Sequence, residues 1–225
     1  MKSIFLRNLL LIILPAILLI GCDESSTIND NTIHGSGRIV SQFRTVDECT
    51  GINVKALGNL YLTQDTIQSV RIEADDNVID DVISRKEGEI LTVGFDEGSY
   101  SDITLNIYVS IKNINSLSIN GAGKIITQQP IDCDELTCFI NGAGSINLKG
   151  SGNYLNCGIN GAGDINTREL IVEKCKAVVN GAGSCTVYAS EEIDASINGT
   201  GSIIYYGNPG NIKTSILGTG QITGR

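Results

Sequence analysis

CFINGAGSI at residues 138–146 returns almost unchanged as CGINGAGDI at residues 157–165. Asn-Gly-Ala-Gly begins at residues 120, 141, 160 and 180, followed by Asn-Gly-Thr-Gly at 198 and Leu-Gly-Thr-Gly at 217. The spacings are therefore 21, 19, 20, 18 and 19 residues. A nearly constant period of this length is the sequence signature of a repeat architecture, in which each repeat buries its apolar side against the next one.

The residues around each tetrapeptide alternate between apolar and polar. The apolar positions are Ile119, Ile140, Ile159, Val179, Ile197 and Ile216 one residue before it, mostly Leu117, Cys138, Cys157, Ala177, Ala195 and Thr214 three before, and Ile125, Ile146, Ile165, Cys185, Ile203 and Ile222 after it. A step of two indicates strands with one buried face. The sequence therefore predicts an all-β fold, a parallel β-helix (β-solenoid) with coils of about 20 residues and a right-handed winding.

Each tetrapeptide is expected to form a corner of its coil. Glycine adopts a positive φ without steric cost and lets stacked backbones approach closely. The asparagine amides can hydrogen-bond from coil to coil, as amide ladders do in stacked sheets. The expected corner residues are Asn120, Gly121, Gly123, Asn141, Gly142, Gly144, Asn160, Gly161, Gly163, Asn180, Gly181, Gly183, Asn198, Gly199 and Gly201.

The segment from residue 64 to residue 115 is less regular, and we expect it to enlarge or cover the N-terminal end of the solenoid. Its strand-like stretches are Val70–Ile72, Ile90–Val93 and Ile103–Ile111. Residues 76–84 predict a short helix with Asp75 or Asp76 as its N-cap. At the other end, the last coil has no evident cap, and an open solenoid end favours self-association through its edge strands.

The first 21 residues have the layout of a secretory signal. Lys2 and Arg7 precede an apolar run, Leu9–Ile20, which is too short to span a bilayer. The run leads into Leu-Ile-Gly-Cys, ending at Cys22, which resembles the bacterial lipobox that signal peptidase II cleaves before the cysteine. We therefore expect a lipoprotein signal peptide over residues 1–21 and a membrane anchor carried by the Cys22 thiol. The alternative is an ordinary signal peptide followed by a chance cysteine.

Residues 22–34 predict a flexible tether, because they are mostly polar and contain no aromatic residue apart from a single imidazole. The folded domain is then expected over residues 35–225. Asp23, directly after the cysteine, resembles an inner-membrane retention signal of enterobacteria, whereas acidic residues near the cysteine resemble a surface-export signal in Bacteroidetes. We expect an exported protein anchored to the cell envelope, at the outer membrane or cell surface in preference to the inner membrane.

The charge of the chain limits its partners. It has 16 basic and 25 acidic residues, a formal net charge of −9, and removal of the signal peptide leaves −11. Only 5% of the residues are aromatic. An acidic, aromatic-poor surface argues against a nucleic-acid partner and is explained by solubility.

The cysteines and the single histidine give little support for chemistry at a metal or a nucleophile. Cys138, Cys157, Cys175 and Cys185 occupy positions that other coils fill with apolar residues, so we expect buried core thiols. The alternative is at least one disulfide, with Cys133 the first candidate because it fits no repeat position. His34 is the one histidine, which argues against histidine zinc sites and catalytic triads, and we expect it in a solvated loop. No metal and no cofactor is expected.

The acidic residues do not form an aligned pair along the repeats. The position after each tetrapeptide holds Lys124, Ser145, Asp164, Ser184, Ser202 and Gln221, whereas a glycosidase needs two carboxyl groups that face one bond. The densest acidic group is Asp75, Asp76, Asp80 and Asp81. Its spacing predicts one solvated helix face, with a weak calcium site as the alternative. We therefore expect a protein that is not an enzyme.

Several motifs together carry a resemblance to a known family. They are Gly35-Ser-Gly-Arg-Ile39, Ile52-Asn-Val54, Leu60-Tyr-Leu62, Val70–Asp75, the repeats, and the Gly-Ile-Asn signature at Gly51–Asn53 and Gly158–Asn160. The chain from residue 35 to residue 225 resembles the bacterial "putative auto-transporter adhesin, head GIN domain" family, also described as a domain of unknown function. Cys49 departs from the pattern, because the family usually has an aromatic residue there. The resemblance implies a β-helical fold, a cell-envelope setting and adhesion.

These observations predict a cell-envelope lipoprotein whose β-solenoid acts as a binding, adhesion-type or structural module, with a glycan or a protein as its ligand. The alternative is a carbohydrate-active β-helix enzyme of the polysaccharide lyase or hydrolase type. The two readings differ in one feature, since the enzyme requires a pair of facing carboxylates in a groove.

Overall fold

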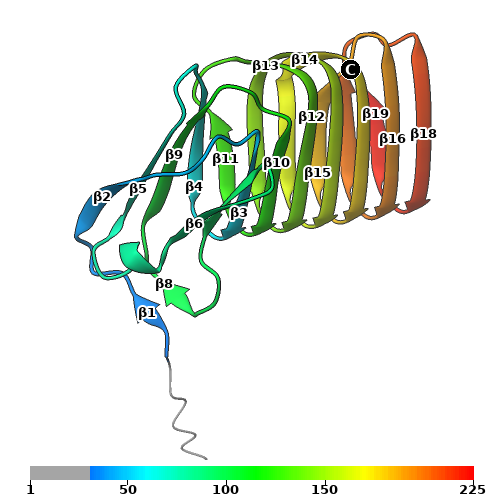
Figure 1. Ribbon diagram of the computed structural model, residues 1–225. Helices are drawn as coiled ribbons and strands as arrows, with labels where there is room; N and C mark the ends of the chain where they lie inside the picture. Colours follow the sequence, from blue (N-terminus) through cyan, green and yellow to red (C-terminus); the bar gives the residue numbers. More distant parts are fainter. Residues whose placement is uncertain (1–30) are drawn as a thin grey trace, which may run out of the picture. The chain divides into compact units, whose positions relative to one another are not determined.

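The computed structural model describes residues 31–225, which form one unit of strands with a single short helix (Figure 1). The elements are β1 (Ile33–His34), β2 (Ile39–Arg44), β3 (Gly51–Ala56), β4 (Asn59–Gln64), β5 (Ser69–Asp75), η1 (Ile79–Asp81), β6 (Ile83–Glu87), β7 (Ile90–Gly94), β8 (Tyr100–Ser101), β9 (Leu105–Ile111), β10 (Ser116–Gly121), β11 (Lys124–Thr127), β12 (Ile131–Gly142), β13 (Ser145–Gly161), β14 (Asp164–Gly181), β15 (Ser184–Tyr188), β16 (Glu192–Gly199), β17 (Ser202–Tyr206), β18 (Asn211–Gly218) and β19 (Gln221–Gly224). The expected signal peptide, Cys22 and the tether up to residue 30 lie outside the described residues.

The repeats form the predicted β-solenoid, whose coils stack in parallel along the right-hand part of Figure 1. On the side before the corner, β10, β12, β13, β14, β16 and β18 pair in this order. Asn120, Asn141, Asn160, Asn180, Asn198 and Leu217 stand opposite one another in consecutive strands. On the side after the corner, β11 is followed by the first parts of β13 and β14 and by β15, β17 and β19. The all-β solenoid with coils of about 20 residues is therefore confirmed, and its handedness stays a prediction.

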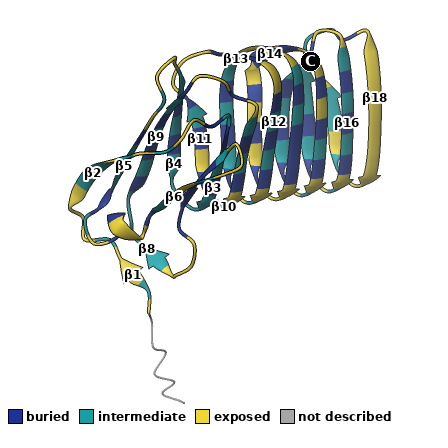
Figure 2. Ribbon diagram, viewed as in Figure 1, coloured by how far each residue is buried: buried dark blue, intermediate teal, exposed yellow. Residues whose placement is uncertain are grey.

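The apolar positions of the repeats point into the solenoid and form its core. Ile119, Ile140 and Ile159 have no solvent-exposed surface. The last coil differs, because Ile212 and Ile216 occupy equivalent inward positions and are 51% and 46% exposed. Figure 2 shows this change as the exposed outer strand β18 beside the buried interior of the preceding coils. The core thus extends to the penultimate coil and ends at an open face.

The coils have a third side, which takes up the variation in repeat length. β13 pairs with β14 across all three sides, and the register shifts between Asn147 and Lys149. Cys133 of β12 stands opposite Gly152, which in turn stands opposite Val172. Cys133 and Val172 are buried, so Cys133 does occupy an inward row, contrary to the sequence interpretation. The row keeps the spacing of the corner asparagines, but Gly152 interrupts its apolar residues, so the alternation of the sequence did not mark it.

The N-terminal strands extend and cover the solenoid, as predicted. β3 and β4 continue its two main sides by pairing in parallel with β10 and β11. β7 pairs in parallel with β3, and β9 pairs in parallel with β4, so these two strands extend both sides of the solenoid by one further strand. Beyond β7 and β9 the pairing becomes antiparallel: β5 pairs with β9, β2 pairs with β5, and β6 pairs with β7. These antiparallel strands form the broader left-hand part of the fold in Figure 1.

The helix predicted over residues 76–84 is wrong. One 3-10 turn, η1, occupies part of the segment, its N-cap is Val78 without a side-chain cap, and strand β6 follows. Asp75 ends strand β5 and is buried, because its carboxylate accepts hydrogen bonds from the backbone N–H of Gly37 (2.6 Å) and of Thr104 (2.7 Å). The four aspartates therefore do not share one exposed helix face.

The end of the expected tether is part of the fold. Ile33 and His34 form strand β1, which pairs in parallel with β8. His34 therefore lies in a strand, not in a loop, although its side chain is 62% exposed and its Nδ1 lies 3.5 Å from the Asp102 carboxylate. No helix among residues 31–225 is long and apolar enough to cross a membrane.

Candidate functional site

One row of outward side chains crosses the sheet from β2 to β19, and we call it the outward row. Each member stands directly opposite the next in the strand register: Phe43, Arg71, Tyr108, Tyr61, Ile126, Asn147, Asn166, Thr186, Ile204 and Thr223. None of them is buried. Their chain neighbours point inward, as Leu60 and Leu62 do on both sides of Tyr61. Strand alternation therefore places the row on the solvent side of the sheet.

The N-terminal part of the outward row is aromatic and lines a groove. The Tyr61 and Tyr108 rings stack with centroids 5.1 Å apart and an interplanar angle of 19°. The Arg71 guanidinium lies over the Tyr108 ring, 4.0 Å from its centroid, and pairs with Glu73. Phe43 stands beside Arg71 and is 78% exposed. The hollow over these strands has a volume of about 380 Å³, and we call it the aromatic groove.

Polar groups surround the stacked rings. The Thr63 hydroxyl donates a hydrogen bond to Oε1 of Gln128 (3.1 Å), and both residues line the groove. Ser110 donates to the backbone carbonyl of Ile67 (2.8 Å) and so holds the exposed Ile67 side chain at the rim. Burial raises the pKa of the Tyr108 hydroxyl, and the Glu73 carboxylate raises it further. The hydroxyl therefore stays protonated at neutral pH and can donate a hydrogen bond.

The aromatic groove is suited to binding. Its stacked rings offer apolar surface, and the surrounding hydroxyl and amide groups offer donors and acceptors, which is the usual composition of a small-molecule site. Asp65 is the one carboxylate among the described residues that line it. Glycoside hydrolysis needs two carboxyl groups. The lining of the groove has groups that can recognise a ligand, but it has one carboxyl group and not two.

A second hollow gathers acidic residues. Asp132, Asp134 and Glu135 line it together with Gln64, and its volume is about 360 Å³. Ser151 donates a hydrogen bond to Asp132 (3.1 Å), and the Asn153 amide donates to Asp134. We call it the acidic hollow. Within residues 31–225 no group of three or more His, Cys, Asp or Glu side chains is arranged to hold a metal ion.

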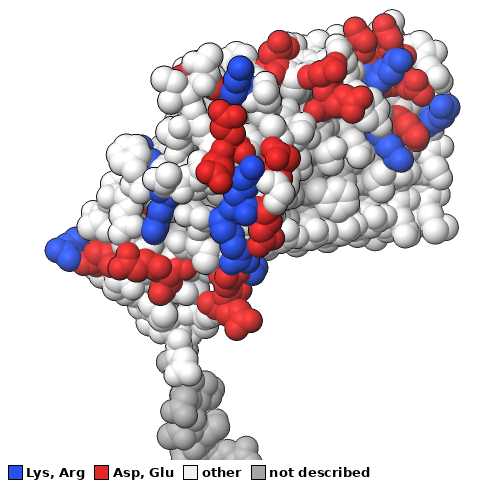
Figure 3. Space-filling model, in the orientation of Figure 1, with Lys and Arg blue, Asp and Glu red and all other residues white. Residues whose placement is uncertain are grey.

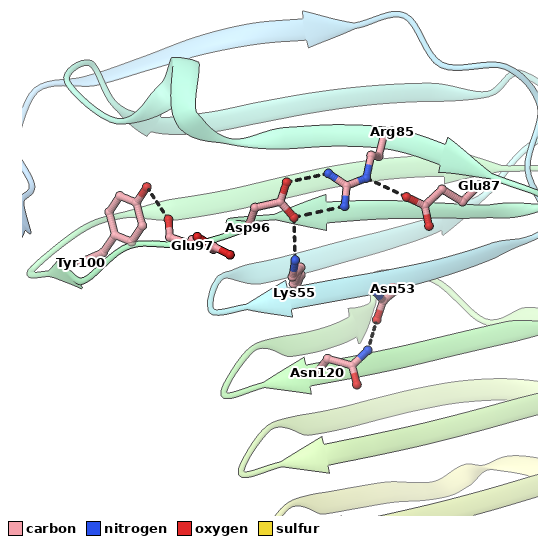
Figure 4. A network of polar contacts seen from close by, with 8 residues as sticks. All are labelled: Asn53, Lys55, Arg85, Glu87, Asp96, Glu97, Tyr100 and Asn120. Carbon is pink, nitrogen blue, oxygen red and sulfur yellow. Dashed lines mark hydrogen bonds and ion pairs between the residues drawn. The ribbon is translucent and has the colours of Figure 1, made fainter.

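The repeat corners carry an amide ladder. The Nδ2 atom of Asn120 donates to Oδ1 of Asn53 (2.7 Å), as Figure 4 shows. Asn141 donates to Asn120 (2.9 Å), and the sequence of bonds continues through Asn160 (3.0 Å) to Asn180 (2.8 Å). Asn120, Asn141 and Asn160 are thereby both donors and acceptors, so the ladder fixes the stacking of neighbouring coils. The ladder includes four of the five corner asparagines that sequence analysis named, and Asn198 lies beyond its end.

Two glycines of each corner have different roles, which Gly161 and Gly163 illustrate. Gly161 has φ +131°, and a Cβ there would collide with the carbonyl oxygen of Gly142 in the preceding coil. Gly163 has no positive φ, yet a Cβ there would lie 2.7 Å from Cγ2 of Ile140 and 2.9 Å from the carbonyl oxygen of Gly144. The first glycine is required by the backbone conformation and the second by close approach.

The cysteines are part of the core. All six in residues 31–225 are free and buried. Cys138 stands opposite Cys157 on adjacent strands. Hydrogen bonds with the thiols of Cys138, Cys175 and Cys185, followed by burial, raise the pKa of Cys157 well above its usual value. Burial raises the pKa of Cys133 to about 11. Protonated, buried thiols are poor nucleophiles and poor metal ligands.

Ion pairs tie the N-terminal strands to the solenoid. Asp96 accepts hydrogen bonds from Arg85 (2.6 Å and 3.1 Å) and from Lys55 of β3 (2.5 Å), and Arg85 also contacts Glu87 (Figure 4). The Arg85 guanidinium, followed by Lys55, lowers the pKa of Asp96 to about 2. On the face seen in Figure 3, charged side chains gather over the N-terminal strands and along the upper edge, while the edge that carries the corners is free of charge.

The sequence did not reveal the aromatic groove. Tyr61 and Tyr108 each stand between two aliphatic residues, as Leu-Tyr-Leu and Ile-Tyr-Val, which marks them as outward residues of strands. That signal was present, but their stacking depends on the pairing of β4 with β9. The two tyrosines are 47 positions apart in a region without a regular repeat, so periodicity could not supply this register.

Solved structures have the same fold. A crystal structure described as a "putative adhesin" from Bacteroides fragilis matches with a TM-score of 0.72 and 24% identity, covering 86% of this chain and 100% of that chain. A "putative lipid binding protein" from Parabacteroides distasonis matches with a TM-score of 0.58 and 21% identity, covering 86% and 99%. A "putative adhesin" from Parabacteroides merdae matches with a TM-score of 0.52 and 18% identity, covering 87% and 99%. At these identities the likeness shows the fold alone.

The sequence also matches a family. No curated protein matches the chain. The family described as "Putative auto-transporter adhesin, head GIN domain" matches residues 48–209, which include the aromatic groove strands β4, β5 and β9 and all but the last coil. The match spans well over half of the chain, and the chain therefore belongs to the head GIN domain family of adhesin-type β-solenoids.

Proposed function

We propose that this protein is a lipid-anchored adhesion module of the bacterial cell envelope that binds carbohydrate through the aromatic groove. The family and the similar solved structures are described as adhesins, which supports an adhesion role without naming a ligand. The observation that carries the ligand class is the stack of Tyr61 on Tyr108 with Arg71 over its other side.

The chemistry of the groove favours a sugar. A pyranose ring has an apolar C–H face and a rim of hydroxyl groups. Tyrosine rings match the face, because they supply rigid apolar area at low entropic cost. Thr63, Gln128 and the protonated Tyr108 hydroxyl match the rim, since together they offer donors and acceptors.

The anchor and the location rest on the N-terminal sequence. The lipobox-like segment ending at Cys22 supports lipid attachment, and stable anchoring requires more than one acyl chain, as mature lipoproteins carry. Labelling cells with a radioactive or clickable palmitate should mark the wild-type protein and leave Cys22→Ser unlabelled. Protease treatment of intact cells then separates the proposed outer-surface position, which is cleaved, from a periplasm-facing one, which is protected.

A glycan array tests the ligand. The chain from Asp23 onward, which lacks the lipid, should bind one or more neutral glycans. The same chain carrying Tyr61→Ala and Tyr108→Ala should lose this binding and keep its circular-dichroism spectrum and melting temperature within a few degrees. Binding that survives both substitutions, or no binding to any glycan, would contradict a carbohydrate site in the groove.

The acidic hollow keeps an enzyme as the second candidate. Asp132, Asp134 and Glu135 stand in one depression, and paired carboxylates are what glycosidases use. Incubation with neutral and uronate-containing polysaccharides, followed by assays for reducing ends and for unsaturated uronates, would detect hydrolase or lyase action. Activity abolished by Asp132→Asn or Glu135→Gln would replace the binding-only function. Product levels equal to those of a buffer control would leave adhesion as the function.

A further inference from the structure

The aromatic groove does not end at Tyr61. Its neighbour along the outward row is Ile126, which is followed by Asn147 and Asn166 on successive strands. These three residues line a second depression of about 170 Å³, which we call the amide hollow. The aromatic groove and the amide hollow therefore lie on one straight row of the same sheet. The row runs across the strands, along the solenoid axis.

The dimensions suit an extended ligand. Tyr108, Tyr61, Ile126, Asn147 and Asn166 are separated by four strand steps. At about 4.8 Å per step, the rings and the amides span about 19 Å. A single sugar ring can cover only one of the two hollows. A linear oligosaccharide that lies along the row can contact both of them at once.

The two amides are positioned to bind hydroxyl groups. Asn147 is half-buried and Asn166 is exposed, and both stand on the outward face. The backbone N–H of Arg168 donates to Oδ1 of Asn166 (3.3 Å), which orients the amide so that its N–H₂ group is available to a ligand. An amide can both donate and accept, which matches the dual character of a sugar hydroxyl.

The charge of the row indicates which polymer fits. Arg71 is the one charged member of the ten, and Glu73 compensates it. Lys149 and Glu169, at the rim of the amide hollow, stand opposite each other and also cancel. The row itself is thus neutral, with Asp65 as one negative charge in the lining of the aromatic groove, on a chain whose net charge is −9. Electrostatic complementarity therefore favours an uncharged polymer, and the net charge repels polyanions.

We infer that the ligand is an uncharged linear glycan that lies along the outward row, with the aromatic groove and the amide hollow as two subsites of one track. The inference rests on the proposed carbohydrate-binding function and adds the direction, the length and the charge of the ligand. The apolar face of one sugar packs on the outward edges of the Tyr61 and Tyr108 rings. Sugars further along the same chain donate to and accept from Asn147 and Asn166.

Chain-length dependence tests the track. Calorimetric titrations would compare neutral gluco-, manno- and laminari-oligosaccharides, from disaccharides to hexasaccharides, on the chain from Asp23 onward. Affinity should rise with length until both hollows are covered. Asn147→Ala with Asn166→Ala should weaken hexasaccharide binding by about fivefold or more and leave disaccharide binding unchanged. Asn156→Ala is the matched control, because Asn156 is a half-buried outward amide of β13 on another side of the solenoid, opposite Thr137.

The outcomes separate the inference from the function on which it rests. Disaccharide binding that Tyr61→Ala removes, without any gain for longer chains, would keep the carbohydrate function and overturn the track. The track is likewise overturned if the asparagine variants match Asn156→Ala, or if only sulfated or uronate polymers bind. Failure of every oligosaccharide to bind would instead remove the proposed function itself.

Discussion

Tyr61 and Tyr108 stand directly opposite each other on the parallel strands β4 and β9, with ring centroids 5.1 Å apart. The pair has a consequence for stability as well as for binding. An in-register stack of two aromatic rings adds about 0.5–1.5 kcal/mol beyond the area that it buries. Tyr61 covers one face of the Tyr108 ring and Arg71 the other, and both tyrosines are half-buried, so each keeps an outward edge available to a ligand.

Tyr61→Ala is expected to lower glycan affinity by about tenfold or more, because it removes one of two adjacent rings from the centre of the groove. Tyr61→Phe should retain most of the affinity, since it keeps the ring. Tyr154→Ala is the control, because Tyr154 is a half-buried outward tyrosine of β13, opposite Glu135 and Lys174 and away from the groove. Equal losses in Tyr61→Ala and Tyr154→Ala would mean that the groove is not the binding site.

The solenoid could be predicted because the sequence pattern that specifies it is local and is repeated in each coil. The inward positions, such as Ile140 and Ile159, recur at almost constant spacing, and the stacking register follows directly from that spacing. The third side was not recognised, because Gly152 interrupts the apolar row of Cys133 and Val172, although these three residues keep the spacing of the corner asparagines.

The prediction for the N-terminal region was wrong for a different reason. Residues 76–84 have the spacing of a short helix, but Asp75 binds backbone groups of Gly37 and Thr104, which are distant in the sequence. These contacts bury the carboxylate and end strand β5 there, so tertiary structure overrides the local helix signal. The same dependence on distant strands hid the stack of Tyr61 on Tyr108.

Gly161→Val should destabilise the protein by about 1–3 kcal/mol, because a β-branched residue is strained at φ +131° and its Cβ collides with the preceding coil. Ala162→Val is the control at the next residue, which is an exposed corner position. Urea unfolding followed by circular dichroism measures both. A Gly161→Val variant as stable as Ala162→Val would show that the corner tolerates a side chain at its first glycine.

A thiol count tests the cysteine assignment. The chain from Asp23 onward contains six cysteines, and all six are free in the structure. Denatured, unreduced protein should therefore react with six equivalents of Ellman's reagent, whereas native protein should react slowly because the thiols are buried and protonated. A count of four would instead indicate one disulfide, and Cys133→Ser would then show whether Cys133 takes part.

The contribution of Asp96 to the stability of the folded protein should depend on pH. Its folded pKa of about 2 lies below the ordinary value, so the ionised carboxylate is stabilised by Arg85 and then by Lys55. That stability is fully present above about pH 4 and is lost as the pH falls towards about 2. The urea midpoints of wild type and Asp96→Asn should thus differ at neutral pH and become equal near pH 2. The midpoint of Arg85→Gln should also approach that of wild type over the same pH range. A difference that is constant with pH would exclude this ion pair as its source.

The exposed outer strand β18 is expected to pair with a second copy of itself. Among the described strands β18 pairs with β16 along one edge, and Ile212 and Ile216 are exposed on its inward side. In an antiparallel pair centred on Thr214, Ile212 of one copy would face Ile216 of the other. The inward apolar rows that contain Ile212 and Ile216 would then continue from one copy into the other. The same pairing would cover the other edge of β18 in both copies.

Light scattering on the chain from Asp23 onward should therefore detect a dimer whose population rises with concentration. Ile216→Lys should abolish it, because an inward-facing charge cannot be buried in the continued core. Ser215→Lys is the matched control, since Ser215 directly precedes Ile216 in the same strand and points to the opposite face. A monomer at the highest accessible concentration, or equal loss of the dimer in both variants, would exclude this pairing.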